Sequence, residues 1–160
     1  MATIYSGTND GHCGHGLGAW ADVRRGAGNV YDSNDSRHAN PVWHFYQSSR
    51  GTWGIYRAFF EFDTSGISIA PSAATLKIQG FAYGEGDIVA VKSTQGGTLA
   101  AGDFNSFHGS VLTAFGNTDG NGAGDLSGVS NFTYSAEITT WSASGYNDIT
   151  LNATAIADMV

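Results

Sequence analysis

The chain has 160 residues, of which 41% are hydrophobic and 13% are charged, and this length and composition suit one domain with its own core. The net charge of −7 excludes the broadly cationic surface that phosphate binding requires, so nucleic acid is not an expected partner. The one cysteine, Cys13, excludes a disulfide within the chain, and no apolar run approaches the roughly 20 residues that span a bilayer. We therefore expect a single domain over residues 1–160, with no membrane partner.

The first 54 residues are predicted to form a loop-rich region. A short β-prone start at residues 2–6 leads into residues 7–18, which are rich in glycine and histidine and are expected to form a loop. A compact aromatic run follows at residues 42–46. The main strands are expected over residues 55–152, and a short terminal turn or helix over residues 153–160.

Three candidate metal ligands, His12, Cys13 and His15, lie within four residues of this expected loop. Zinc usually takes four ligands, with a second pair elsewhere in the chain, and the other histidines lie far away without further cysteines. We therefore expect no metal and no cofactor. The preferred interpretation is a loop or a contact between chains.

Residues 55–63 predict a strand with two distinct faces. The period of two residues separates Tyr56, Ala58, Phe60 and Phe62 from Ile55, Arg57, Phe59, Glu61 and Asp63. We expect the first set to face the core. Glu61 and Asp63 point the same way from one strand and would not flank a substrate, and Arg57 on their face could neutralise them.

A β-hairpin is predicted in the middle of the chain. Alternating residues 76–83 are followed by the turn signal Gly84-Glu-Gly-Asp87 and by the apolar run at residues 88–91. The two runs are expected to pair antiparallel.

The last third contains further short elements. Leu99, Phe104 and Phe107 are expected to anchor a helical turn or a packed loop, and residues 111–115 could form a strand. Residues 116–128 are a glycine-rich loop in which Asp119–Asp125 resembles a calcium loop but lacks the glutamate of an EF-hand, so a plain turn is the default. Residues 132–141 should contain a strand, residues 149–152 alternate, and Asn152 or Thr154 could cap a terminal helix.

Two segments together resemble a family signature. The strand Arg57-Ala-Phe-Phe-Glu-Phe-Asp-Thr-Ser-Gly-Ile67 and the second strand Ala74-Thr-Leu-Lys-Ile-Gln79 are similar to the middle of jelly-roll domains in virion proteins of tailed phages, and more distantly to DNRLRE-type carbohydrate-binding-like modules. Shorter segments at residues 1–6, 19–21, 103–109 and 146–152 agree with it. The resemblance implies an all-β fold, an antiparallel jelly-roll β-sandwich with long glycine-rich loops and little helix.

The resemblance also implies a virion setting. We expect a non-enzymatic structural protein, most simply a capsid decoration or cement protein that binds the outer surface of the major capsid protein shell and stabilises it. It would be made in the host bacterial cytoplasm, because the first residues lack the basic start and apolar run of a signal peptide. The proteins that it resembles continue with a further strand or two after the segment at residues 146–152, so either an edge of the sandwich is left exposed or a neighbouring chain covers it. This favours assembly, and we expect a homotrimer.

Charge is distributed unevenly along the chain. Residues 1–63 hold five arginines against six carboxylates, whereas residues 64–160 hold two lysines against eight. Interfaces favour aromatic and arginine side chains, so Trp20, Arg24 and Arg25 are the candidate contacts to the capsid or to other copies.

The alternative function is a carbohydrate-binding receptor-recognition module of a tail fibre or spike. Trp43 and Trp53 are the candidate sugar platform, because they flank the polar stretch Gln47-Ser-Ser-Arg-Gly51 and an exposed indole can stack on a sugar ring. An enzyme is not expected, because the chain has no Gly-x-Ser-x-Gly elbow, His-Glu-x-x-His helix or phosphate-binding loop.

Overall fold

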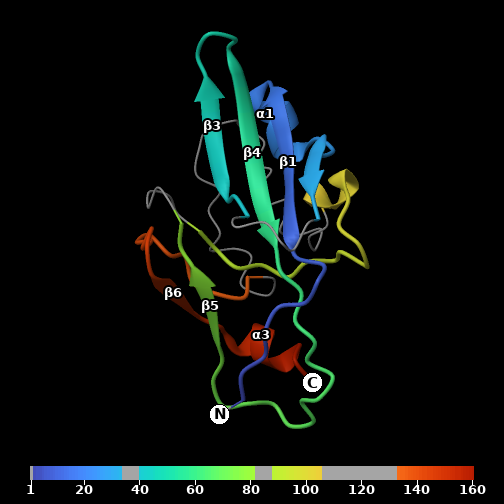
Figure 1. Ribbon diagram of the computed structural model, residues 1–160, viewed down its shortest axis with the longest axis vertical. Coiled ribbons are helices and arrows are strands. Elements are labelled where there is room, and N and C mark those ends of the chain that lie inside the picture. Colours follow the sequence, from blue (N-terminus) through green and yellow to red (C-terminus); the bar gives the residue numbers. More distant parts are fainter. Residues whose placement is uncertain (1, 34–39, 82–87, 106–132) are drawn as a thin grey trace. The chain divides into compact units, whose positions relative to one another are not determined.

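The computed structural model describes residues 2–33, 40–81, 88–105 and 133–160, and their regular structure is mostly antiparallel strand with little helix (Figure 1). The all-β prediction is therefore confirmed, whereas the jelly-roll sandwich stays a prediction. Contacts group the chain into two compact units, each built from two segments. Unit 1 comprises Met1–Asp63 and Ser93–Leu126, and unit 2 comprises Thr64–Lys92 and Ser127–Val160.

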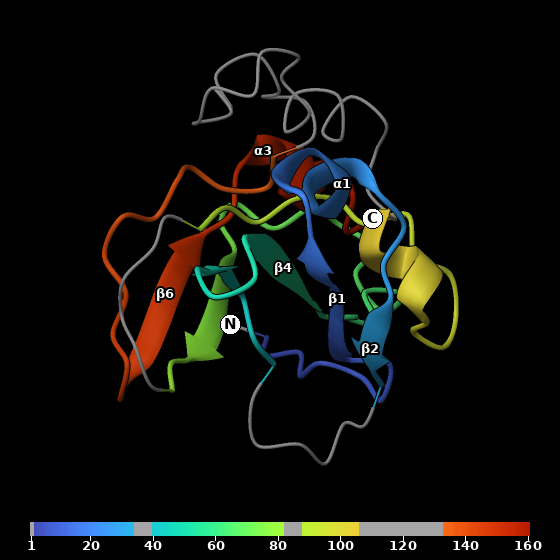
Figure 2. The same ribbon diagram turned by 90° about the horizontal axis from the view of Figure 1, so that it is seen from above.

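Unit 1 is built on a four-stranded antiparallel sheet with the strand order β2-β1-β4-β3. Its strands are β1 (Gly11–Gly18), β2 (Val30–Asp32), β3 (Trp43–Gln47) and β4 (Thr52–Phe59). The two long strands β1 and β4 lie side by side in the middle, as Figures 1 and 2 show. Among the described strands, the short β2 and the aromatic β3 form the edges.

The loop expected at residues 7–18 is wrong, because β1 is a central strand of this sheet. Cys13 lies opposite Tyr31 on β2 and opposite Arg57 on β4, so the backbone is paired on both sides. A Cβ atom at Gly14 would lie 2.7 Å from the ring of Tyr56, so this glycine leaves room for the ring to cover it. The sequence does not reveal this strand, because its glycines have no side chains that could show an alternating pattern. Side chains of neighbouring strands, such as Tyr56, cover them instead.

The face of β4 that builds the core is the opposite of the predicted one. Phe59 is only 4% exposed and Cys13 is fully buried, whereas Phe60 lies beyond the end of β4 and is partly exposed. The helix α1 (Trp20–Arg25) and the 3-10 turn η1 (Ala101–Asn105) contribute the buried Val23 and Phe104. Both faces of residues 55–62 carry aromatic side chains, so alternation alone could not tell which one is covered.

A tight turn joins β3 to β4. The backbone N–H of Arg50 donates to the carbonyl of Gln47 at 3.1 Å, and Gly51 adopts a φ of +63°, which favours glycine. The polar stretch at residues 47–51 is thus a β-hairpin turn, in keeping with its predicted loop character.

Unit 2 contains the two-stranded antiparallel sheet of β5 (Thr75–Gln79) and β6 (Tyr146–Thr150). Leu76 lies opposite Ile149, which is 2% exposed. The predicted pairing of residues 76–83 with residues 88–91 is wrong, because Ile88 and Val91 instead form bridges with residues of the 133–138 segment. The turn Gly84–Asp87 that should have joined them lies outside the described residues.

Two predicted helical segments are confirmed. The turn η1 forms where Leu99 and Phe104 were expected to anchor one, and both side chains are buried. The terminal helix α3 (Ala153–Ala157) begins after Asn152, whose side chain accepts the N–H of Ala155 at 3.0 Å. Phe107 and the expected strand at residues 111–115 lie outside the described residues.

Candidate functional site

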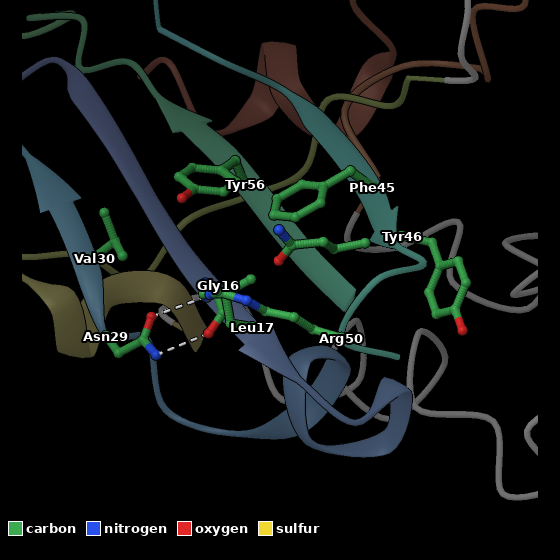
Figure 3. Close-up of a pocket in the computed structure, with 9 residues that line it drawn as sticks. Gly16, Leu17, Asn29, Val30, Phe45, Tyr46, Arg50 and Tyr56 are labelled. Atoms are coloured by element: carbon green, nitrogen blue, oxygen red, sulfur yellow. Dashed lines mark hydrogen bonds between the residues drawn. The ribbon is translucent and has the colours of Figure 1, made fainter. Parts of the chain in front are cut away.

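An open hollow of about 680 Å³ lies on unit 1, with one side chain or more from each of the four strands and from the β3–β4 turn (Figure 3). Part of it is aromatic. Phe45 and Tyr56 lie nearly parallel, at 29° with ring centroids 6.4 Å apart, and Trp43 meets Tyr56 at 5.7 Å. These three rings share one face because Trp43 lies opposite Tyr56 and two residues from Phe45.

One rim of the hollow is a strained bulge in β1. The pairing with β4 shifts between His15 and Gly18, and Leu17 is held at a φ of +61°, which is unusual for a residue with a branched side chain. The amide of Asn29 holds the bulge, since its oxygen accepts the N–H of Gly16 at 2.9 Å and its nitrogen donates to the carbonyl of Gly16 at 3.2 Å (Figure 3). Leu17 is left about half exposed beside the hollow.

The described residues that line the hollow carry a positive charge. Arg50 is the charged residue among the described residues that line it, and none of these is acidic. Within the described part of the chain, the guanidinium of Arg50 forms neither a hydrogen bond nor an ion pair, while Gln47 contributes a buried amide oxygen without a partner. The hollow therefore combines apolar rings with two polar groups, the Arg50 guanidinium and the Gln47 amide oxygen, that have no hydrogen-bond partner within the described part of the chain.

The structure does not bring the predicted sugar platform together. Trp43 pairs with Tyr56 on the neighbouring strand, so these two side chains lie on the same face of the sheet. Trp53 lies three residues before Tyr56 on β4, an odd number, so its side chain lies on the other face. Trp53 contacts Tyr46 at 4.7 Å, and Figure 3 shows Tyr46 turned away from Phe45. A platform built from both indoles is therefore excluded.

The predicted contact residues lie on the helix α1. Trp20 begins the helix, is partly buried, and meets Trp53 with ring centroids 5.0 Å apart. Much of its surface is thus used within unit 1. The side chains of Arg24 and Arg25 lie outside the described part, so both remain predicted contacts.

The candidate metal ligands do not converge. Successive residues of β1 point to opposite faces, which separates His12 from Cys13 and His15. The thiol of Cys13 donates to the carbonyl of Ala100 at 3.0 Å. Burial, with a contribution from Asp103, raises the pKa of Cys13 to about 12, so the thiol stays protonated.

No group of three or more His, Cys, Asp or Glu side chains that could hold a metal ion occurs among the described residues. The possible calcium loop at Asp119–Asp125 lies outside them. The residues that the structure places offer no metal centre.

Arg57 contacts the turn η1, whereas its predicted neutralisation of Glu61 and Asp63 stays a prediction. Its guanidinium donates to the carbonyl of Phe104 and to Oδ1 of Asn105, and it lies 3.8 Å from the centroid of the Phe104 ring. Burial lowers the pKa of Arg57 to about 10, so it remains a cation at neutral pH. Arg57 therefore joins β4 to η1.

A second surface feature of unit 1 is the apolar edge, which we define as Val42, Trp43 and Tyr46. Each is at least half exposed, and Trp43 and Tyr46 belong to the edge strand β3. The aromatic run was visible in the sequence, but its position at an edge was not, because that depends on the order of the strands.

No helix in the described part of the chain has the length and hydropathy needed to cross a membrane. Comparison with protein-family models, with curated proteins and with solved structures finds no match to this chain. The function must therefore be argued from the residues themselves and from the two surface features of unit 1.

Proposed function

We propose that this protein is a non-enzymatic virion structural protein, a capsid decoration protein that binds the outside of the major capsid protein shell. The virion setting and the jelly-roll fold come from the resemblance of the strand segments at residues 57–67 and 74–79. The observation that carries the binding role is the apolar edge of unit 1. A function based on assembly needs such a surface, and it needs no catalytic group.

The apolar edge suits a protein contact for two reasons. Edge strands have unpaired backbone groups on one side, and proteins commonly protect them with lysine, proline or a bulge inside the strand. The five residues of β3, Trp43–Gln47, contain neither lysine nor proline, and their pairing with β4 is regular. Exposed Trp and Tyr side chains are also the types enriched at interfaces.

We propose that copies of the chain associate as a homotrimer on the shell. Closed symmetry repeats one modest contact surface and so multiplies its affinity for a symmetric partner. The apolar edge and the predicted contacts on α1, Trp20, Arg24 and Arg25, are the surfaces that this assembly would use.

The test is to locate the protein on purified particles by reconstruction and to compare variants. Trp43→Lys should abolish incorporation into the shell, because a lysine on an edge strand opposes pairing and removes an aromatic contact. Tyr146→Lys is the matched control, since Tyr146 is an exposed aromatic residue on unit 2. Absence of the wild-type protein from the shell would overturn the proposal.

A second candidate function is a carbohydrate-binding receptor-recognition module. One observation favours it, namely the hollow on unit 1, in which aromatic rings lie beside hydrogen-bonding side chains. A few copies at the tail of the particle, rather than many on the shell, would support this second candidate.

A further inference from the structure

We infer that the hollow on unit 1 is a binding site for a carboxylate-bearing saccharide, such as a segment of an acidic polysaccharide. The residues that carry this inference are Leu17, Phe45, Arg50 and Tyr56. The inference rests on the second candidate function and gives it a substrate class and a site different from the predicted tryptophan platform.

The strained bulge indicates that this part of the surface is specialised. Holding a leucine at positive φ costs folding free energy, and such conformations persist where the surrounding structure enforces them, often at binding sites. Here the two hydrogen bonds between Gly16, the residue before Leu17, and the Asn29 amide enforce it. The conformation leaves an apolar side chain at the rim of the hollow, where it is about half exposed to water.

The aromatic rings favour a ligand with an apolar face. Phe45 and Tyr56 are each only partly buried and lie nearly parallel. A pyranose ring presents CH groups on a face and hydroxyls around its edge, which matches apolar rings bordered by amide and guanidinium groups. A peptide main chain fits less well, because β1 and β4 under the hollow are already paired on both sides.

Charge complementarity favours an acidic ligand. The chain as a whole has a net charge of −7, yet the described residues that line the hollow include Arg50 and no acidic side chain. A planar guanidinium binds a carboxylate through paired hydrogen bonds, and the exposed turn lets Arg50 adjust to it. A neutral sugar would leave this donor group with water alone.

The test is titration of the whole protein, followed by two-dimensional NMR, with trigalacturonate, its methyl ester and triglutamate as probes. We expect saturable binding of trigalacturonate, with shifts at the signals of Leu17, Phe45 and Tyr56. The methyl ester, which lacks the negative charge, should bind about tenfold more weakly.

Two variants locate the site without unfolding the protein. Arg50→Gln should weaken trigalacturonate binding about tenfold and leave the weak methyl ester binding unchanged. Lys77→Gln, which removes a positive charge from the exposed surface of unit 2, is the control and should bind like the wild type.

Leu17→Gly tests the strained bulge. Glycine adopts a φ of +61° without strain, so the melting temperature should stay the same or rise while the affinity for trigalacturonate falls several-fold. Loss of stability without loss of affinity would mean that the bulge is purely structural and would overturn its role in binding.

The outcomes separate this inference from the functions on which it depends. Equal binding of the methyl ester at the same residues would overturn the acidic substrate class but keep a carbohydrate-binding module. Tighter binding of triglutamate than of trigalacturonate would overturn the saccharide class. Binding of none of the three probes would overturn the inference and leave the capsid decoration proposal to be decided on particles.

Discussion

The two units bury different kinds of side chain. Among the described residues, unit 1 buries the large apolar Phe59, Leu99 and Phe104 as well as the polar Asp10 and His12, whereas unit 2 buries the polar Thr133, Ser135 and Asn147 with the apolar Ile149 and Ala155. Apolar burial is non-directional and scales with area, while buried polar groups are tolerated only with correctly placed partners. Substitutions should therefore act on unit 1 mainly through lost volume and on unit 2 mainly through unsatisfied hydrogen bonds.

The largest expected effect is truncation of the unit 1 core. Phe59→Ala should lower the free energy of unfolding by about 3–5 kcal/mol, because it removes a buried ring and leaves a cavity. Phe60→Ala is the matched control and should cost clearly less, since Phe60 is partly exposed. Urea denaturation of both variants measures the difference. A larger loss for Phe60 would place the core on the face that the sequence predicted.

The next effect concerns Arg57, which contacts η1 from β4. Arg57→Met should destabilise the protein by about 1.5–3 kcal/mol, because it removes the donors to the Phe104 carbonyl and to Asn105. The stability of Arg57→Lys should lie between that of the wild type and that of Arg57→Met, since lysine keeps the charge but lacks the planar group over the Phe104 ring. Thermal denaturation checks the order. A fully stable Arg57→Met variant would show that packing alone holds η1 on the sheet.

In unit 2, the buried Asn147 should stabilise the protein through its hydrogen bonds, in contrast to the buried ring of Phe59 in unit 1. Its side chain accepts the N–H of Ser142 at 2.7 Å and donates to the carbonyl of Ser142 at 3.0 Å, so it closes the turn before β6. Asn147→Ala should cost about 1–3 kcal/mol although it removes little volume, because it takes the partner from the N–H and the carbonyl of Ser142 in a part-buried turn. Asn147→Asp, which keeps an acceptor but loses the donor, should also destabilise. Equal stability of all three proteins would contradict the comparison between the units.

The smallest effect is a dependence on pH in unit 2. Asp158 accepts hydrogen bonds from Lys92 at 2.8 Å and from the hydroxyl of Tyr134, and these hold the pKa of Asp158 below its usual value of 3.8. A lowered pKa means that the stabilisation is present above pH 3.8 and is lost as the pH falls through the folded-state pKa. The carboxylate is about one-third exposed, so the contribution should stay under about 1 kcal/mol.

The hydrogen bond between Tyr134 and Asp158 also makes the stability of the protein fall at alkaline pH. Burial and the contact with Asp158 raise the pKa of Tyr134, so its contribution is present below pH 10 and is lost as the pH rises towards the folded-state value. Asp158→Asn should remove the acidic loss, and stability at neutral pH should fall by the same small amount, under about 1 kcal/mol. Unfolding curves between pH 2 and pH 7 provide the measurement, and an identical acidic loss in the variant would assign it to other carboxylates.

The hollow could be predicted from the sequence only in part. The aromatic run at residues 42–46 and the polar turn at residues 47–51 were both recognisable, because composition and turn residues are local signals. The pairing that sets Phe45 beside Tyr56 and the bulge at Leu17 was not recognisable. These features depend on register, and a shift of one residue would send each side chain to the other face.

Local chemistry in the sequence thus determined the all-β class, the β3–β4 turn, the η1 turn and the cap at Asn152, since each needs only neighbouring residues. The tertiary structure decided that a glycine-rich segment forms the central strand β1, that Phe59 and Arg57 face the core, and that Trp43 and Trp53 point apart. The physical reason is that backbone pairing and burial are set by distant segments. Glycine and alternating aromatic residues allow several arrangements, and only contact with those segments selects one.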